Sequence, residues 1–417
     1  MIYTKPHPVV VAEDALEQLI DYCRQNNYTR LQIVADVNTD RALGCKLETM
    51  FDSAGFNVQK VLLHGQEIIA DAERVYQVML ALDGSQRILI AVGAGTITDI
   101  TRFVSHRLGL PFISAPSAPS VDGFASIGAP VLIDGVKISL PTHAPAAIFA
   151  DLNVLSDAPR AMIAAGFADI LGKFTSVADF RLGHLLYNER YDAEIAQRTY
   201  AVARVCEEHA EAIGQATPAS IRLLMHALVE SGLIILDFGD SASASGAEHH
   251  MSHFWEMMLL RKGRPAILHG AKVGVATVMI ADLYAQVRAL SRAEAADRLE
   301  AATLPEKDAE LAAIRSAFGA EAEAVARNHA PFLDMTPDDY DAIKRRILER
   351  WDEIQTVAAQ VPPPDEIARL LAVVGGPTTA AELGLTDAEA ALALDNGHYL
   401  RNRFTVRKLA RVLGLRA

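Results

Sequence analysis

The sequence predicts an α/β domain built on a parallel sheet, followed by an all-helical domain. Two features of the pattern support this fold class. The first 150 residues alternate short β-branched runs with amphipathic segments, whereas from about residue 160 onward the apolar residues recur with a period near 3.6. The length points the same way, because 417 residues exceed what one ordinary core holds. We place the division at residues 1–155 and 156–417.

Four short apolar runs are typical of strands: LQIVADV (31–37), VQKVLLHG (58–65), RILIAVG (87–93) and PFISAPS (111–117). Each is bounded by Gly, Pro, Asp or Asn, residues that favour turns. The amphipathic segments between them lie at 12–26, 39–54 and 68–83. This alternation predicts a parallel sheet with helices on both faces.

Composition excludes several classes of protein. Hydrophobic residues make up 51% and charged residues 22%, which is typical of a soluble globular chain. The net charge of −13 argues against a general nucleic-acid or membrane-surface binder. No apolar run approaches the roughly 18–20 residues that span a bilayer. The three cysteines are odd in number and far apart, which fits a reducing cytoplasm.

A glycine-containing turn follows the third predicted strand. In ILIAVGAGTITDITRFVS (88–105), Gly93 and Gly95 precede a predicted helix, whose free N–H groups attract phosphate. The turn departs from G-x-G-x-x-G because Thr98 occupies the third glycine position. Asp36, at the end of an earlier strand, is suited to accept hydroxyl groups of an adenosine ribose. Together they indicate a dinucleotide site, although a plain strand-to-helix turn and an N-capping Asp36 are the competing interpretations.

The next loop, SAPSAPSVDGFASIGAP (114–130), is small, rich in hydroxyl groups and stiffened by proline. Its carboxylate, Asp122, precedes Gly123, so a surface Asp-Gly turn is one interpretation. Ligands also bind in such loops, beyond the strand ends of an open parallel sheet.

Candidate metal ligands lie in the helical half. His249 and His253 are four residues apart in SASGAEHHMSHFWEM (241–255), so they face the same way on a helix. His269 sits at a probable helix start, and Asp169 interrupts an apolar stretch. One Asp and two His form a suitable divalent site with an open coordination position. The competing interpretation is a set of satisfied polar residues, with Asp169 paired to Lys173.

With these motifs in place, the chain resembles the sn-glycerol-1-phosphate dehydrogenase family. That family belongs with the iron-type alcohol dehydrogenases, glycerol dehydrogenases and dehydroquinate synthases. The resemblance rests on GAGTITDI, SAPSVDGFAS, GFADILGK, SGAEHHMSHFWE and LHGAKVGVAT, in family order through residues 93–277. The family's G-G-G-S is altered here, since Ala94 and Thr96 replace a glycine and the serine. Thr96 keeps the hydroxyl group, so we expect the phosphate loop to be retained.

The resemblance implies roles for individual residues. Asp169, His249 and His269 correspond to the metal ligands, His253 and Asp122 to substrate contacts, and Asp36 to the adenosine side of the cofactor. Asp169 and His253 are thereby expected to serve catalysis, and His250 has no assigned role. The implied nicotinamide-cofactor contacts are Gly93, Gly95, Thr96, Ile97, Thr98, Asp99, Ser117, Ala118, Pro119, Ser120 and Ser126.

The implied reaction is hydride transfer between NAD(P)H and dihydroxyacetone phosphate, giving sn-glycerol 1-phosphate. It requires NAD(H) or NADP(H) and one divalent metal, zinc or nickel before iron. The candidate cations for the substrate phosphate are Lys173, Lys262, Arg264, Arg401 and Arg403.

Three alternatives stay open: a dehydrogenase of an unphosphorylated polyol such as glycerol, a dehydroquinate synthase-like cyclase, and a binding protein on a decayed scaffold. We expect the protein to be cytoplasmic and to form a homodimer or a larger homo-oligomer.

Overall fold

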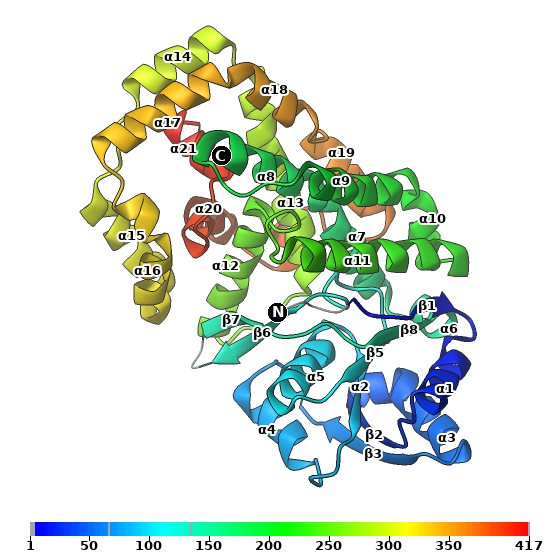
Figure 1. Ribbon diagram of the computed structural model, residues 1–417. Coiled ribbons are helices and arrows are strands. Elements are labelled where there is room, and N and C mark those ends of the chain that lie inside the picture. Colours follow the sequence, from blue (N-terminus) through cyan, green and yellow to red (C-terminus); the bar gives the residue numbers. More distant parts are fainter. Residues whose placement is uncertain (1–4, 66, 134–135, 416–417) are drawn as a thin grey trace. The chain divides into compact units, whose positions relative to one another are not determined.

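A six-stranded parallel sheet organises the first part of the chain in the computed structural model, which describes residues 5–65, 67–133 and 136–415 (Figure 1). The strand order is β1-β8-β5-β4-β2-β3. The strands are β1 (Val9–Ala12), β2 (Arg30–Asp36), β3 (Asn57–Leu63), β4 (Ile88–Gly93), β5 (Phe112–Pro116) and β8 (Ala147–Asp151). A separate antiparallel hairpin pairs β6 (Gly128–Ile133) with β7 (Val136–Pro141). The predicted α/β class of this part is confirmed.

Each face of the sheet carries its own hydrophobic cluster. On one face, α1 (Ala15–Gln25) and α3 (Cys45–Ser53) bury leucine and aromatic side chains against β2, β4, β5 and β8. On the other, α4 (Ala72–Leu80) and α5 (Gly95–Leu108) pack against β2, β3, β4 and β5. Burial on both faces explains why the central strand β4 is apolar throughout, since all six of its residues are buried.

The strand order places three predicted site segments in a row. β2 and β4 are neighbours in register, with Val34 opposite Ala91, so Asp36 lies level with Gly93. Gly93 in turn pairs with Pro116 on β5. The connections after β2 and β4 leave in opposite directions, since β3 and β5 lie on opposite sides of this strand pair. Such a reversal at the carboxyl edge is where open α/β sheets bind ligands.

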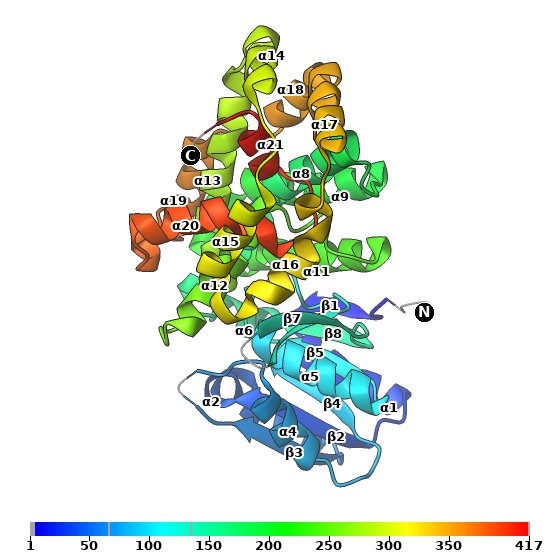
Figure 2. The ribbon, with the colours of Figure 1, turned by 90° about the vertical axis from the view of Figure 1, so that its left-hand side faces the viewer.

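The rest of the chain is helical (Figure 2). Its helices are α6 (Leu152–Ser156), α7 (Arg160–Leu171), α8 (Lys173–Tyr187), α9 (Ala193–Glu208), α10 (Ala210–Gln215), α11 (Pro218–Phe238), α12 (Ala247–Arg261), α13 (His269–Ala289), α14 (Arg292–Ala301), α15 (Lys307–Phe318), α16 (Ala322–Leu333), α17 (Pro337–Glu349), α18 (Trp351–Ala359), α19 (Pro364–Val373), α20 (Asp387–Asn396) and α21 (Val406–Val412). A short 3-10 helix, η4 (Gly397–Leu400), precedes α21. The predicted change from mixed to helical structure is confirmed.

Contacts divide the chain into two units. The first comprises Met1–Ile170 and Glu208–Asp240, and the second comprises Leu171–Glu207 and Ser241–Ala417. Most of α7 and the whole of α10 and α11 therefore group with the parallel sheet. The division into a dinucleotide-binding α/β domain, residues 1–155, and an all-helical metal- and substrate-binding domain, residues 156–417, stays a prediction.

Two helical stretches, Arg160–Tyr187 and Pro218–Phe238, are long and apolar enough to cross a membrane by length and composition. A third, His269–Ala301, qualifies only if two helices bent by 106° are counted together. In the first two, 89% and 61% of the apolar window is buried inside the protein. Burial inside the protein therefore covers nearly all of the first apolar window and a little over half of the second.

Candidate active site

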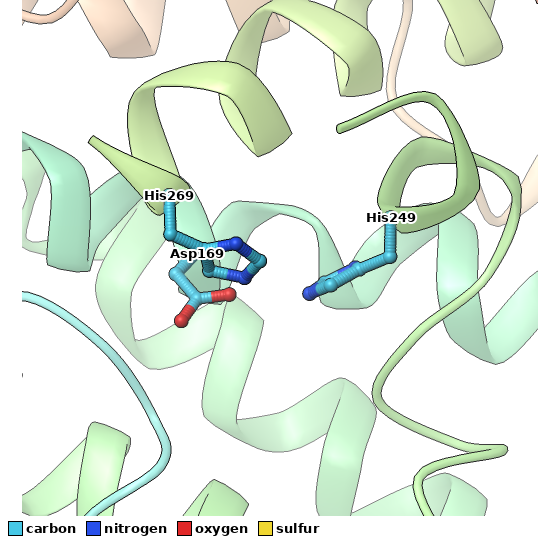
Figure 3. A group of neighbouring side chains, drawn as sticks. All are labelled: Asp169, His249 and His269. Atoms are coloured by element: carbon cyan, nitrogen blue, oxygen red, sulfur yellow. The ribbon is translucent and has the colours of Figure 1, made fainter. Parts of the chain in front are cut away.

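Asp169, His249 and His269 lie together, with one possible ligand atom from each and all of these atoms within 4.8 Å of one another (Figure 3). Figure 3 shows the ring of His249 pointing toward the other two side chains. Asp169 and His249 are buried, and His269 is half-buried at the first position of α13. Ligand atoms held about 2.0–2.2 Å from one ion lie roughly 3–4 Å apart. Small side-chain movements would therefore bring these three ligand atoms to metal-binding distances. One carboxylate and two imidazoles suit zinc, nickel or iron.

Glu248 is a buried partner of His249 that the sequence analysis did not single out. Its Oε1 lies 2.7 Å from His249 Nδ1 and accepts a 2.7 Å bond from the Gly246 amide. Its Oε2 accepts a 2.8 Å bond from the Thr175 hydroxyl. Burial alone would raise the pKa of Glu248, but the bonds from His249, Gly246 and Thr175 hold it below its ordinary value. The carboxylate therefore stays charged and holds the His249 ring through Nδ1.

A second buried carboxylate supports the start of α12. Asp179 on α8 accepts bonds from the Ala247 amide at 2.8 Å, the Tyr284 hydroxyl at 2.7 Å and the Val406 amide at 2.6 Å. Burial, and then the charge of Glu248, raise the pKa of Asp179 to about 7. Asp179 thus forms hydrogen bonds with the first residues of α12 and α21 and with Tyr284 of α13.

Asp122 is held next to Asp169 by the backbone. The Asp122 amide donates to Asp169 Oδ2 at 3.0 Å, and the Ser231 hydroxyl on α11 donates to Asp122 Oδ2 at 2.8 Å. Two glycines permit the close approach of this loop. A Cβ at Gly166 would collide with the carbonyl oxygen of Pro119, and one at Gly232 would lie 2.7 Å from that of Asp122. Asp122 is therefore fixed by hydrogen bonds and packing rather than lying in a free surface turn.

The glycine turn begins α5 at Gly95, without a side-chain cap. The first amide groups of a helix lack intrahelical partners, so this end is suited to bind an anion. A Cβ at Gly93 would lie 2.7 Å from Ile97, and one at Gly95 would lie 3.2 Å from Val121. Asp36 caps the short helix α2 (Val37–Thr39), because its Oδ1 accepts the amides of Asn38 and Thr39. Both the turn and the cap anticipated as competing interpretations are present, and neither precludes cofactor binding.

The loop after β5 is secured by a buried arginine. Arg102 on α5 is fully buried, pairs with Asp99 at 2.9 Å, and donates to the carbonyls of Gly123, Phe124 and Gly128. The predicted cofactor residues Ser117, Ala118, Ser120 and Ser126 are all buried in or beside this loop. Arg102 was missed because a lone arginine in a helix carries no sequence signal of burial.

His253 lies one turn beyond His249 and remains partly exposed. Its ring centroid is 5.7 Å from that of His269 and 6.3 Å from that of His249. Glu256 Oε2 lies 3.7 Å from His253 Nδ1 and 3.5 Å from Lys272 Nζ. Glu256 and the buried Lys272 were also missed, although each lies one turn beyond a predicted site histidine.

His250 faces a different environment. It is fully buried, and neither ring nitrogen has a hydrogen-bond partner among the described residues. Burial and the nearby Arg403, Arg401 and Lys408 hold its pKa well below the ordinary value. The imidazole is therefore neutral and acts as a packed core side chain.

Two of the five basic residues proposed to bind the substrate phosphate already form ion pairs with another residue. Lys262 and Arg264 pair with Glu389, at 2.6 Å and 2.9 Å. Lys173 and Arg403 also have backbone acceptors, Ala244 and Ser245. These contacts make Lys262 and Arg264 poor candidates for the substrate phosphate.

Comparison with known proteins shows the family to which the chain belongs. The model of the iron-containing alcohol dehydrogenase family matches residues 10–159. Solved structures share the fold at low identity. Glycerol dehydrogenase from Schizosaccharomyces pombe has a TM-score of 0.64 at 16% identity, covering 99% of this chain and 89% of that one. A probable glycerol dehydrogenase from Sinorhizobium meliloti has a TM-score of 0.63 at 16% identity, covering 99% and 96%.

Curated relatives are closer in sequence. The glycerol-1-phosphate dehydrogenase [NAD(P)+] of Halalkalibacterium halodurans is 37% identical over 95% of this chain and 90% of its own length. That of Geobacillus thermodenitrificans is 38% identical over 95% and 90%. An archaeal protein of the same name, from Methanosarcina barkeri, is 36% identical over 67% of this chain and 77% of its own length. The chain belongs to the glycerol-1-phosphate dehydrogenase family of iron-type alcohol dehydrogenases.

Proposed function

We propose that this chain is an oxidoreductase that interconverts dihydroxyacetone phosphate and sn-glycerol 1-phosphate with NAD(H) or NADP(H). The relatives named above carry that activity in their names. The observation that carries the proposal is the Asp169, His249 and His269 cluster, because a decayed scaffold would have lost a ligand. These three residues would hold a divalent ion, zinc or nickel before iron. When bound, such an ion supplies Lewis acidity at the substrate oxygen where negative charge develops.

The protein's own side chains would position the substrate. Asp122 presents a carboxylate that Ser231 and the loop packing hold in place, and such a group can grip a substrate hydroxyl. His253 is partly exposed beside His269 and can donate a hydrogen bond to the substrate oxygen. It can give this oxygen a proton when the ketone is reduced and accept the proton when the alcohol is oxidised. Glu256 Oε2 lies 3.7 Å from His253 Nδ1 and would help to hold this ring in place.

The cofactor would lie along the carboxyl edge of β2, β4 and β5. The start of α5 offers amide groups to the pyrophosphate, and the buried loop Ser117–Ser126 offers hydroxyl groups to the nicotinamide side. Asp36 is level with Gly93 at this edge, so its carboxylate would accept a ribose hydroxyl and repel a 2′-phosphate.

The deciding assay follows NADH absorbance with the metal-loaded protein and either dihydroxyacetone phosphate or dihydroxyacetone. The proposal expects turnover with the phosphorylated ketone at least about tenfold above that with dihydroxyacetone. A preference for dihydroxyacetone would support the unphosphorylated polyol instead, and turnover with neither would point to the cyclase or binding-protein alternatives. We expect the enzyme to act in the cytoplasm as a homodimer or larger homo-oligomer, and analytical ultracentrifugation tests its oligomeric state.

A further inference from the structure

The second unit contains a cavity that no residue of the candidate active site lines. Its volume is about 160 Å³. That is about an order of magnitude more than the roughly 10–15 Å³ that one water needs on this measure. The walls come from α15, α16, α17, α21, η4 and the segment before α15, and the lining residues that matter here are Thr303, Lys307, His329, Phe332, His398 and Lys408. Thr303 and Lys307 are exposed, so the cavity opens to solvent at this rim.

The cavity wall carries more positive than negative charge. Glu310 is the only carboxylate among the described lining residues, and Arg411 already pairs with it at 2.6 Å. Lys307 pairs with Asp334 at the surface. The charge of Lys408 is therefore left without a matching carboxylate in the wall.

Lys408 is a buried lysine whose ammonium group is bound by backbone carbonyl oxygens rather than by a carboxylate. Its side chain is buried, and no described carboxylate lies within the 4.0 Å of an ion pair. It contacts the carbonyls of His398 and Arg401 at 3.4 Å and that of Arg403 at 2.5 Å, and it lies 3.7 Å from the Phe332 ring centroid. A buried charge is costly without a counter-charge. Burial lowers the pKa of Lys408 to about 7, and the more distant charges of Glu189 and Asp179 offset this only in part.

His398 adds a donor without an acceptor. Arg411 donates to His398 Nε2 at 2.8 Å, and an arginine can only donate. The neutral ring must therefore carry its proton on Nδ1, which is buried and has no partner among the described residues. His329 Nδ1, also buried, likewise lacks a described partner. An unpaired buried polar atom costs the free energy of its lost hydration, so a ligand in the cavity could supply a partner for each ring.

We propose that this cavity binds a small oxyanion, of phosphate or carboxylate type, on the Lys408 ammonium and the His398 Nδ1–H group. The anion supplies the missing negative charge and the missing acceptor together. Phe332 and the apolar wall accommodate a short carbon skeleton attached to the anion. Because none of the lining residues belongs to the candidate active site, the anion does not compete with the substrate for its contacts.

Equilibrium dialysis of the metal-loaded, full-length protein with inorganic phosphate, and in a second series with acetate, tests the proposal. We expect saturable binding that Lys408→Met weakens at least about tenfold, as for loss of a charged hydrogen bond. The matched control is Lys307→Met, which removes a lysine of the same cavity that is exposed and already paired; it should bind within about twofold of the wild type. Whichever of the two anions binds more tightly identifies the head group.

A second variant tests the same cavity without removing the buried charge of Lys408. Thr303→Trp fills the exposed rim and alters no ion pair, so the folded protein should lose anion binding as Lys408→Met does. Unchanged affinity in both variants would place the bound anion elsewhere, including at the metal cluster, and would overturn the proposal. No saturable binding of either anion up to tens of millimolar would overturn it as well.

Discussion

Glu248→Gln tests whether the buried carboxylate tunes the metal cluster. The amide has nearly the same shape, and it can keep its oxygen toward His249 and Gly246 if its NH₂ group faces Thr175. The Thr175 hydroxyl can then accept this bond and donate to the Gly172 carbonyl, which lies 3.0 Å away. The substitution therefore removes the charge while leaving each group a partner.

The magnitude follows from the bonds that lose their charge. Hydrogen bonds to a charged group contribute about 1.5–3 kcal/mol and neutral ones about 1 kcal/mol, so the His249 bond weakens by roughly 0.5–2 kcal/mol. The imidazole also becomes a poorer metal ligand without the adjacent charge. Changes of such outer partners typically lower metal affinity by about 10–100-fold. We expect that range for Glu248→Gln, with a parallel fall in kcat/KM.

Chelator competition with Zn²⁺ measures the affinity, and circular dichroism checks the fold. Thr175→Val is the matched control, because it removes the bond to Glu248 Oε2 and leaves Oε1 on His249. It should change metal affinity by less than about threefold. Equal affinities for Glu248→Gln and the wild type would show that Glu248 only caps the helix.

Four further predictions follow from the same contacts. His249→Ala should strip the metal and abolish turnover whereas His250→Ala should leave both largely intact, and metal analysis of the purified variants compares them. Asp122→Asn should lower kcat/KM for dihydroxyacetone phosphate about tenfold with unchanged NADH binding, since a charged bond is replaced by a neutral one; silent kinetics would remove Asp122 from the site. The wild type should use NADH at least as well as NADPH, and Asp36→Gly should improve NADPH use; a strong NADPH preference unaffected by the change would contradict the ribose contact. Burial, then Lys408 and Arg411, lower the pKa of His329 to about 2, so below pH ~6.5 only the unfolded chain takes up this proton. The free energy of unfolding is therefore unaffected by this proton above pH ~6.5 and falls by about 1.4 kcal/mol per pH unit below it. Urea denaturation at two pH values below about 6.5 should show that the free energy of unfolding depends less steeply on pH in His329→Phe than in the wild type.

The fold was predictable where the pattern is local. The four predicted strands match β2 to β5 within a residue or two, because each is a β-branched run between turn residues. β1 and β8 were missed, and they form a parallel pair between the two ends of this part of the chain, with Val9 opposite Ile148. Pairing over such a separation in the sequence leaves no local signal. The β6–β7 hairpin was not predicted either, and the stretch 114–130 that was treated as one loop contains only its first three residues.

The candidate site was predictable where a motif carries chemistry. Asp169, His249 and His269 stand out because polar residues interrupt apolar or small-residue segments, and the structure brings their ligand atoms together. Arg102 and Lys408 are different, because their importance comes from burial among backbone carbonyl groups, those of a later loop for Arg102 and those of the segment just before α21 for Lys408. In the sequence they are simply two basic residues in predicted helices, and such residues are usually exposed to solvent. Nothing in the sequence therefore indicated that they are buried.

Glu248 contacts the neighbouring His249 because both lie at the start of a helix, although adjacent residues within a helix rarely touch through their side chains. Adjacent residues on a helix point about 100° apart and do not normally face each other. Helix α12 begins at Ala247, however, so Glu248 is in the first turn, and its side chain turns back to accept the Gly246 amide. The same Oε1 then reaches His249 Nδ1. The helix start thus aligns the carboxylate with the ring, and an insertion before Ala247 should disturb metal binding even with every ligand present.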